Sequence, residues 1–418
     1  MNKFRIQGGQ RLHGTVAVRG GKNAAVAVLS AALLCDEPVT IENLPKIEDI
    51  HHLTIMMREL GARVMHTGRS MTIDPTDFRP GQVTEQYARS MRASYYLLGA
   101  MLGKYGRGNM PYPGGCDIGS RAIDQHVKGF GALGATITSE HGQLVGRSLG
   151  LKGAEVYFDF PTVGATVNVM LAACRAAGSS TIVNAAKEPH IVDVANFLNA
   201  MGASIKGAGT DIIRIKGVES LHGCSYAIIP DQIETGTLMV AAAATRGDVT
   251  ILGAIPTHME ALSAKLLEMG AHVQEGVGQD SIRVWSDGNH RHVNIKTLPY
   301  PGFPTDLQQP MSVLLTTARG ISVINETIYE ARFKHLEEAT RMGASVRIND
   351  RLAMIEGVQK LSGCPVAAND LRAGAALVIA GLMAEGITVV DNVRFIDRGY
   401  ENFEQKLSSL GAKIERIP

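Results

Sequence analysis

One short pattern occurs six times along this sequence and constrains its fold more than any other feature. The pattern reads Leu or Met, Gly, Ala, any residue, then Val or Ile. Its glycines are separated by 68 or 73 residues along the 418-residue chain: Gly61, Gly134, Gly202, Gly270, Gly343 and Gly411. Self-similarity at a near-constant spacing indicates a repeated supersecondary element. We therefore expect six copies of one structural repeat.

The residues around each glycine predict what the repeat contains. An amphipathic helix precedes the glycine, as in the apolar stripe of Met259, Leu262, Leu266 and Met269. The glycine can end that helix in the left-handed conformation, and the Val or Ile that follows can open a strand. Further upstream, each copy has a segment that is apolar on nearly every side and predicts a buried helix: residues 24–35, 92–102, 164–177, 234–245, 306–318 and 371–384. This is the pattern of an α/β protein, and 418 residues favour two domains of three repeats each.

The two ends of the chain complement each other. The last copy stops at Pro418, before the second strand segment that other copies contain, for example at residues 354–363. Residues 4–14 have the sequence pattern of that missing segment. We therefore expect the N-terminus to complete the sixth repeat. This predicts one domain of residues 22–229 and a second, discontinuous domain of residues 1–21 and 230–418 that contains both termini.

The composition excludes several classes of function. Lys and Arg number 41 against 40 Asp and Glu, so a net charge of +1 gives no general attraction to nucleic acid or to an anionic membrane. Five cysteines, an odd number, form no CxxC pair and no metal-ligand spacing, which favours a reducing cytoplasm. The longest apolar runs are too short to span a bilayer, and the N-terminus lacks the pattern of a secretory signal. The oligomeric state is left open.

Polar residues gather at the starts of the predicted buried helices. Helix N-termini carry free amide donors and a positive dipole end, so several of them together would bind phosphate groups. An alternative for the acidic members Asp231, Glu234 and Asp370 is helix capping. The full set is Lys22, Asn23, Arg92, Thr162, Val163, Gly164, Asp231, Glu234, Asp306, Asp370 and Arg372.

Two further motifs are candidates for chemistry. Cys116 lies in a glycine-rich segment, residues 113–121, where a thiol near Arg121 could act as a nucleophile or proton donor; the alternative is an incidental free cysteine. The segment 397–401 is predicted to begin the last amphipathic helix, and residues 330–333 hold the same place one repeat earlier. An arginine there, Arg398 or Arg332, suits bidentate binding of carboxylate or phosphate. A salt bridge from Arg398 to a neighbouring acid is the alternative.

These motifs together resemble the UDP-N-acetylglucosamine 1-carboxyvinyltransferases of the enolpyruvyl transferase family. The resemblance covers essentially the whole chain and is carried by residues 22–25, 91–94, 113–121, 304–306, 370–373 and 397–401. It implies the two-domain enolpyruvyl transferase fold, an inside-out α/β barrel with three α/β repeats per domain. It also implies transfer of the enolpyruvyl group of phosphoenolpyruvate to the 3′-hydroxyl of UDP-N-acetylglucosamine with release of phosphate, the first committed step toward peptidoglycan precursors. No metal or organic cofactor is implied.

The resemblance also assigns roles to residues. Cys116 would be the proton donor and would form a covalent adduct with phosphoenolpyruvate, Asp306 would be the general base, and Lys22 and Arg398 would also be catalytic. Phosphoenolpyruvate would contact Lys22, Asn23, Arg121, Arg372 and Arg398. The nucleotide sugar would contact Asn23, Arg92, Arg121, Ala122, Ile123, Asp124, Gln125, Thr162, Val163, Gly164, Asp306 and Ile328. A thiol-directed epoxide phosphonate such as fosfomycin should alkylate Cys116.

Four positions depart from the commonest wording of that family: Thr162, His190, Gln232 and Ala331. They would fit a second paralogue within one bacterium. Two other functions compete with the one implied. The first is enolpyruvyl transfer to shikimate 3-phosphate on the same fold, and the second is a non-catalytic relative that senses the nucleotide sugar.

Overall fold

The computed structural model describes residues 2–115, 118–119, 122–276 and 280–418, and these form two compact units. Unit A comprises residues 20–115 and 122–229. Unit B comprises residues 2–19, 118–119 and 230–418. Each unit has its own hydrophobic core. Among the described helices, none combines the length and the hydropathy that a membrane span requires.

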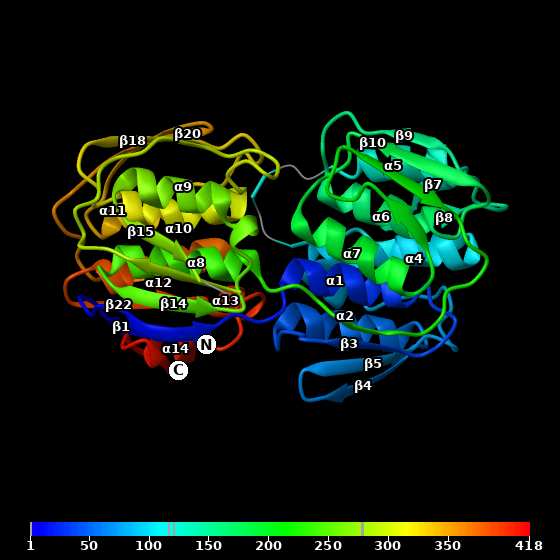
Figure 1. Ribbon diagram of the computed structural model, residues 1–418, viewed down its shortest axis with the longest axis horizontal. Coiled ribbons are helices and arrows are strands. Elements are labelled where there is room, and N and C mark those ends of the chain that lie inside the picture. The colour runs from blue at the N-terminus through cyan, green and yellow to red at the C-terminus, as the bar shows by residue number, and fades with distance from the viewer. Residues whose placement is uncertain (1, 116–117, 120–121, 277–279) are drawn as a thin grey trace. The chain divides into compact units, whose positions relative to one another are not determined.

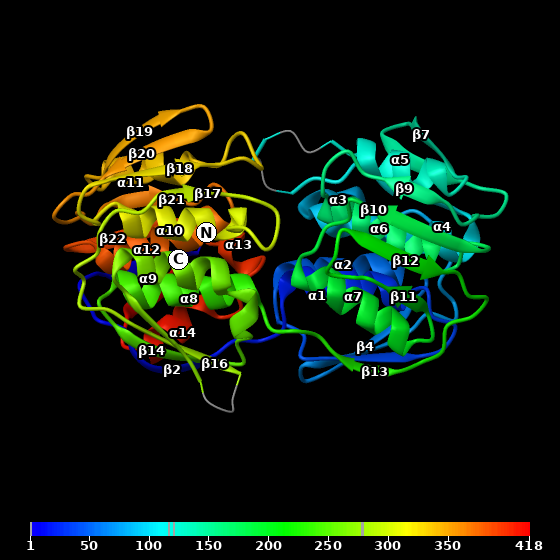
Figure 2. The ribbon, with the colours of Figure 1, turned by 45° about the horizontal axis from the view of Figure 1, so that its top comes forward.

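Unit A has three buried helices, with sheets and amphipathic helices around them (Figure 2). The buried helices are α1 (Lys22–Ala32), α4 (Tyr96–Tyr105) and α6 (Val163–Ala173), and α4 packs against both of the others. The amphipathic helices are α2 (Glu48–Glu59), α5 (Asp124–Ala132) and α7 (Pro189–Ala200). A short helix α3 (Glu85–Ser90) and a 3₁₀ turn η1 (Arg92–Tyr95) lead into α4, so the predicted helix at residue 92 begins as a 3₁₀ turn.

The strands of unit A form three sheets. The first has the order β13 (Ser225–Ala227), β3 (Val39–Glu42), β5 (Ser70–Asp74), β4 (Arg63–Thr67). The second has the order β6 (Arg107–Pro111), β8 (Gln143–Arg147), β7 (Thr136–Glu140). The third has the order β11 (Ser204–Lys206), β12 (Ile212–Lys216), β10 (Ser179–Val183), β9 (Glu155–Tyr157).

Unit B repeats this plan. Its buried helices α8 (Gln232–Ala244), α10 (Thr305–Leu315) and α12 (Leu371–Met383) pack against one another. Figure 1 shows them between the sheet that contains β18 and β20 and the sheet that contains β1 and β22. The other helices are α9 (Glu260–Met269), α11 (Lys334–Arg341), α13 (Arg394–Asp397), α14 (Phe403–Ser409) and the 3₁₀ turn η2 (Pro256–His258). Helices inside and sheets outside are the layers expected for the inside-out α/β barrel.

The strands of unit B also form three sheets. The first has the order β15 (His272–Glu275), β16 (Ser281–Trp285), β14 (Asp248–Leu252), β2 (His13–Ala17). The second has the order β17 (Ile295–Lys296), β18 (Ile321–Asn325), β20 (Leu352–Glu356), β19 (Ser345–Asn349). The third has the order β21 (Pro365–Ala367), β22 (Ile387–Asp391), β1 (Lys3–Gln7), β23 (Lys413–Ile417).

Neighbouring repeats are joined by a parallel strand. In unit B, β17 pairs in parallel with β18, β21 with β22, and β2 with β14, so each repeat ends on a strand in the sheet of another repeat. The remaining pairs in these sheets are antiparallel. Strand β2 follows β1, the strand that completes the sixth repeat, and pairs with β14 in the fourth repeat. These strand exchanges therefore connect the three repeats of unit B in a closed ring.

The N-terminal strand completes the sixth repeat, as the sequence pattern predicts. Strand β1 lies between β22 and β23 and is antiparallel to both, with Phe4 opposite Val390 on one side and Arg416 on the other. The six repeat glycines also behave as expected, because all of them have φ between 88° and 101°. This is the left-handed region that ends each amphipathic helix.

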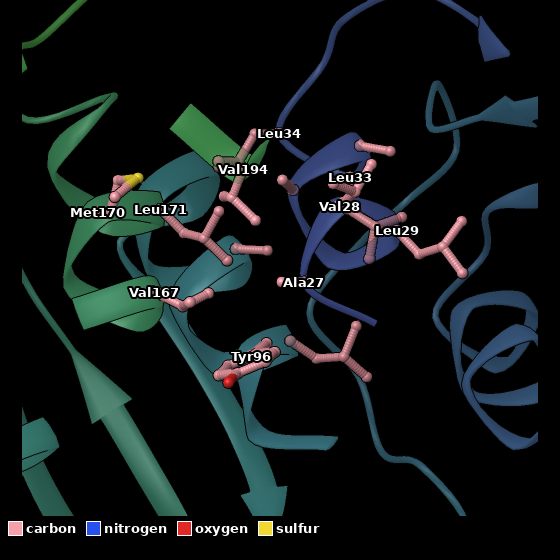
Figure 3. Packing of buried hydrophobic residues seen from close by; sticks show 14 of the residues in the cluster. Ala27, Val28, Leu29, Leu33, Leu34, Tyr96, Val167, Met170, Leu171 and Val194 are labelled. Carbon is pink, nitrogen blue, oxygen red and sulfur yellow. The ribbon is translucent and has the colours of Figure 1, made fainter. Parts of the chain in front are cut away.

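The core of unit A depends on close approach of its helices (Figure 3). Val167, Met170 and Leu171 of α6, Val28 of α1 and Leu33, the residue after α1, belong to one buried cluster. Helix α4 reaches α6 at Gly99, whose N–H donates to Oδ1 of Asn168 at 3.1 Å. A Cβ at position 99 would lie 2.8 Å from the backbone oxygen of Asn168 and 3.2 Å from its Cα.

We predict that Gly99→Ala destabilises unit A by about 1–3 kcal/mol, because the added methyl group overlaps the backbone of α6. Alanine has the higher helix propensity, by about 1 kcal/mol, so propensity alone predicts stabilisation. Gly131→Ala is the matched control, since Gly131 lies in α5 and an added Cβ meets nothing within 4 Å. Urea denaturation of both variants checks this, and a Gly99→Ala variant as stable as Gly131→Ala would contradict it.

Candidate active site

Asp306 lies in the first turn of α10 between two arginines from elsewhere in unit B. Arg332 Nη2 donates to Asp306 Oδ1 at 2.6 Å. Arg372 donates to Asp306 Oδ2 from Nη2 at 3.2 Å and from Nε at 3.3 Å. The two guanidinium side chains are 4% and 3% exposed, whereas the Asp306 side chain is 28% exposed. Two buried cations thus hold one carboxylate at the accessible end of a buried helix.

Arg332 is also linked to a second buried acid, Glu326, through the hydroxyl of Thr305. Its Nη1 donates to Thr305 Oγ1 at 2.8 Å, and Thr305 Oγ1 donates to Glu326 Oε2 at 2.8 Å. Glu326 is fully buried and also accepts from Thr297 Oγ1 at 2.9 Å. Burial opposes the charge of Arg332, but Asp306 and Asp370 outweigh it and keep the pKa of Arg332 above its usual value. Arg332 is therefore a fixed cation.

Arg372 lies at the start of α12, next to the ring of Tyr400. Its guanidinium carbon is 5.2 Å from the ring centroid, and the Tyr400 hydroxyl is 2.9 Å from Thr237 Oγ1. Burial again opposes the charge, but the nearby Tyr400 and Asp306 keep the pKa of Arg372 raised. The resemblance had assigned Arg372 to the substrate carboxylate; in this structure it holds Asp306.

The capping interpretation holds for two of the three acids considered. Asp231 Oδ1 accepts from the first-turn amides of α8 at 2.7 and 3.0 Å, and Asp370 Oδ1 accepts from those of α12 at 2.8 and 3.0 Å. Glu234 is not a cap, because its carboxylate forms an ion pair with Lys406 of α14. For Glu234 the capping interpretation is therefore wrong.

The segment around Arg398 differs from the prediction. Residue 398 follows the short helix α13, and the last amphipathic helix begins only at Phe403, so this segment does not begin that helix. Asn402 has a φ of 48°, and this left-handed residue separates the two helices. Asp397, the acid next to Arg398 in sequence, accepts two bonds from Arg416 at 2.8 and 2.9 Å.

In unit A, Lys22 is the first residue of α1 and pairs with a buried acid. Its Nζ lies 2.6 Å from Oδ2 of Asp49, which is 1% exposed and belongs to the first turn of α2. Asn23 follows Lys22 on α1 and is half-buried. The sequence reasoning missed Asp49. Its helical spacing from Leu53 and Met56, which puts it on the buried face of α2, was the available signal, since a carboxylate there needs a partner.

A second group in unit A brings together three predicted residues. Arg92 Nη2 donates to the carbonyl of Ala122 at 3.4 Å, and its guanidinium lies 5.2 Å from the ring centroid of Tyr95. The ring of Tyr95 meets His126 edge-on, with the ring centroids 4.5 Å apart. Gly164, at the start of α6, faces the His126 ring, because a Cβ there would lie 3.0 Å from it. Tyr95 and His126 were not predicted.

His126 is the neutral centre of this group. Burial lowers its pKa to about 3, with Arg92 adding to the shift and Asp124 opposing it. Asn168 Nδ2 lies 3.0 Å from His126 Nδ1, so Nδ1 is the acceptor and Nε2 carries the hydrogen. The arrangement offers an uncharged donor beside the cationic Arg92.

The other residues predicted to contact the nucleotide sugar form hydrogen bonds within the protein or lie at the first residues of helices. Gln125 Nε2 donates to Asp124 at 2.7 Å and to Asp159 at 2.9 Å. Ile123 is the N-cap of α5, Thr162 is the N-cap of α6, and Val163 begins α6. In unit B, the amide of Ile328 donates to Glu326 at 2.9 Å.

Cys116 and Arg121, which were predicted to be catalytic and substrate-binding, lie outside the described residues. Two residues further along, the carbonyl of Ile118 accepts from the amide of Ala331 at 3.2 Å. Ile118 therefore lies beside the residue that precedes Arg332 in unit B.

The described groups suit the chemistry of small anions. Buried arginines recognise carboxylate and phosphate by paired N–H donors. A carboxylate held between two such arginines stays ionised and can accept a proton from a substrate hydroxyl. Unit B provides this combination at Asp306, and unit A provides Lys22 at the start of the buried helix α1 and Arg92 in the 3₁₀ turn that leads into α4.

Comparison with known proteins gives the family. A family model described as EPSP synthase (3-phosphoshikimate 1-carboxyvinyltransferase) matches residues 6–407. The chain is 58% identical over 417 residues to UDP-N-acetylglucosamine 1-carboxyvinyltransferase 3 of Caldanaerobacter subterraneus, with all of both chains covered. It is 55% identical over 416 residues to UDP-N-acetylglucosamine 1-carboxyvinyltransferase 2 of Geobacillus kaustophilus, covering 100% of this chain and 97% of that one.

A solved structure agrees. The enolpyruvyl transferase NikO from Streptomyces tendae superposes with a TM-score of 0.89 at 25% identity, covering 100% of this chain and 99% of NikO. The chain therefore belongs to the enolpyruvyl (1-carboxyvinyl) transferase family, and the predicted fold class is confirmed. Within that family it falls among the UDP-N-acetylglucosamine 1-carboxyvinyltransferases, the name that both full-length relatives carry, so the resemblance seen in the sequence motifs is confirmed.

Proposed function

We propose that this chain transfers the enolpyruvyl group of phosphoenolpyruvate to the 3′-hydroxyl of UDP-N-acetylglucosamine and releases phosphate. The names of its full-length relatives support this activity. The structural observation that carries the proposal is Asp306, a carboxylate held by the buried Arg332 and Arg372 at the start of α10. The product is a precursor of peptidoglycan, and we place the enzyme in the cytoplasm, the reducing compartment that its cysteines favour.

The reaction needs one base and one acid. The sugar 3′-oxygen adds to C2 of phosphoenolpyruvate while a proton is added to C3, which gives a tetrahedral phosphate-bearing ketal. Loss of a proton from C3 and of phosphate from C2 then restores the double bond. Asp306 takes the hydroxyl proton as general base, and Cys116 supplies the proton to C3. The assignment of Cys116, and of its covalent adduct with phosphoenolpyruvate, comes from its sequence motif alone.

Fixed cations stabilise the negative charges of the substrate. Lys22, Arg121 and Arg398 bind the phosphate, and Arg372 and Arg398 bind the carboxylate. Charges that are already in place need no reorganisation during the reaction, which makes such sites effective. Arg372 pairs with Asp306 in this structure, so in this assignment it would contact the base and the substrate carboxylate together. Asn23 also contacts phosphoenolpyruvate.

The nucleotide sugar binds mainly to unit A. Arg92 and the neutral His126 beside it support this placement, because together they offer cationic and uncharged donors to a nucleotide diphosphate. The proposed contacts are Asn23, Arg92, Arg121, Ala122, Ile123, Asp124, Gln125, Thr162, Val163, Gly164, Asp306 and Ile328. We assign residues 22–229 to the domain that binds the nucleotide sugar and residues 1–21 and 230–418 to the other domain.

Phosphate release from phosphoenolpyruvate tests the proposal. We expect release that depends on UDP-N-acetylglucosamine and falls by at least about 10²-fold in Cys116→Ser, since loss of a general acid removes 10²–10⁴-fold in rate. Cys364→Ser is the matched control, because Cys364 is a half-buried thiol in unit B that packs against the core. It should retain wild-type turnover.

The same assay separates the alternatives. The matching family model describes a 3-phosphoshikimate enzyme, so shikimate 3-phosphate is the second acceptor to test. Turnover with shikimate 3-phosphate comparable to that with the nucleotide sugar would overturn the proposal. Binding of the nucleotide sugar without phosphate release would instead indicate a non-catalytic sensor.

A further inference from the structure

A chain of buried polar groups lies behind Arg332. Ser312 of α10 and His335 of α11 are both fully buried. Ser312 Oγ donates to the carbonyl of Gln309 at 2.8 Å and lies 2.6 Å from Nε2 of His335. None of these groups has been assigned a role in the reaction.

The position of the imidazole hydrogen follows from this geometry. A serine hydroxyl has one hydrogen, and the carbonyl of Gln309 can only accept it. Ser312 Oγ must then accept from His335, so Nε2 carries the hydrogen and Nδ1 is left with a lone pair. The opposite tautomer would leave two buried donors, Nδ1 of His335 and Nε of Arg332, without acceptors, which is unfavourable.

The remaining two atoms are complementary. Within the part of the chain that the structure describes, neither Nδ1 of His335 nor Nε of Arg332 has a hydrogen-bond partner, and both are buried. Arg332 precedes Phe333, the N-cap of α11, and His335 is the second residue of that helix. The charge of Arg332 contributes to the lowered pKa of His335, so the two side chains lie near each other. Burial lowers the pKa of His335 to about 3, so its lone pair stays available. Nδ1 of His335 needs a hydrogen-bond donor, and Nε of Arg332 is a donor that needs an acceptor.

We propose that His335 is a positioning residue for the general base: its Nδ1 accepts from one bridging water molecule that in turn accepts the Nε hydrogen of Arg332, and His335 thereby fixes the guanidinium that holds Asp306. Ser312 in turn fixes the imidazole. This inference rests on the proposed function, because it assumes that Asp306 is the base. Groups behind a reacting side chain commonly affect activity by fixing its orientation.

Two variants of His335 separate this role from simple packing. An asparagine carbonyl can replace Nδ1, whereas a glutamine amide reaches the position of Nε2 and so keeps Ser312 but not Arg332. Both leave a polar side chain in the same site. We expect His335→Asn to stay within about threefold of wild-type kcat and His335→Gln to lose about tenfold or more. KM for the nucleotide sugar should not change in either variant.

The pH dependence gives a second readout. A carboxylate whose cationic partner is less well fixed takes up a proton more readily, so the acid limb of the kcat profile should move to higher pH in His335→Gln. Equal losses in the two variants, or wild-type kcat in His335→Gln, would overturn the positioning role. Thermal melting of both variants shows whether a loss of kcat reflects unfolding.

A measurement on the wild-type protein is independent of activity. Long-range ¹⁵N–¹H NMR correlations of the imidazoles, assigned by comparison with His335→Gln, report which nitrogen carries the hydrogen. We expect Nε2–H for His335 across pH 5–9, and a hydrogen on Nδ1 would refute the arrangement. If the wild-type chain releases no phosphate, the proposed function fails while this spectrum still decides the hydrogen-bond arrangement.

Discussion

Asp306→Asn is expected to lower kcat by about 10²–10⁴-fold, the range that a general base contributes, while KM for phosphoenolpyruvate stays the same or falls. An amide cannot take the hydroxyl proton. It also leaves Arg332 and Arg372 without the carboxylate that both now hold. Arg372, which we propose to bind the carboxylate of the substrate, loses the competing carboxylate of Asp306 and should bind phosphoenolpyruvate at least as well as before.

Steady-state kinetics with varied phosphoenolpyruvate check this split between kcat and KM. Asp248→Asn is the matched control, because Asp248 pairs with Arg283 at the surface and should leave both parameters unchanged. A variant of Asp306 that keeps kcat within about fivefold of wild type but binds phosphoenolpyruvate much more weakly would contradict the role of a base. It would indicate that Asp306 serves only to arrange the two arginines.

The repeat made the architecture predictable, because its signal is local. A glycine at the end of an amphipathic helix must have the left-handed conformation, and all six repeat glycines do. The buried helices were equally clear, since a segment that is apolar on every side has no solvated face. The last repeat lacks a strand segment that residues 4–14 supply, and this predicted that the N-terminal strand β1 would complete that repeat, where it pairs with β23.

The partners of charged residues were not predictable in the same way. Arg332 and Arg372 were singled out in the sequence as candidates for binding an anion, but nothing in the sequence indicated that both would contact Asp306. The same holds for Asp49, which pairs with Lys22 from another helix. Such pairings depend on tertiary packing between segments that are far apart in sequence.

Local helix boundaries near the candidate site were also missed. Residues 397–401 looked like a helix start by analogy with residues 330–333, yet α13 ends there and α14 begins at Phe403. A left-handed Asn402 makes the difference, and single asparagines adopt this conformation only in some contexts. The analogy between repeats therefore holds for the helices and strands and fails for the loop segment around Arg398.

The buried ion pair between Glu234 and Lys406 leads to the largest expected effect on stability. Glu234 is 5% exposed in α8, and its partner comes from α14. Lys406→Met should destabilise unit B by about 3–5 kcal/mol at pH 7, because it leaves a buried carboxylate without its cation. Urea denaturation measures this. Lys265→Met is the control, since the surface pair of Lys265 and Glu268 should contribute at most about 1 kcal/mol.

The pH dependence distinguishes a charge effect from lost packing. Burial already raises the pKa of Glu234 above its usual 4.5, and Lys406 opposes that shift. Without Lys406 the pKa rises further, so the folded variant keeps its proton to higher pH than the unfolded chain does. A group with a raised pKa in the folded state loses its contribution to stability as pH rises. The deficit of Lys406→Met should therefore be small below about pH 4.5 and grow toward neutral pH. A deficit that is constant with pH would show that the lysine acts through packing of its methylene chain. In that case the double variant Glu234→Gln with Lys406→Met, which removes the buried charge, should be no more stable than Lys406→Met alone.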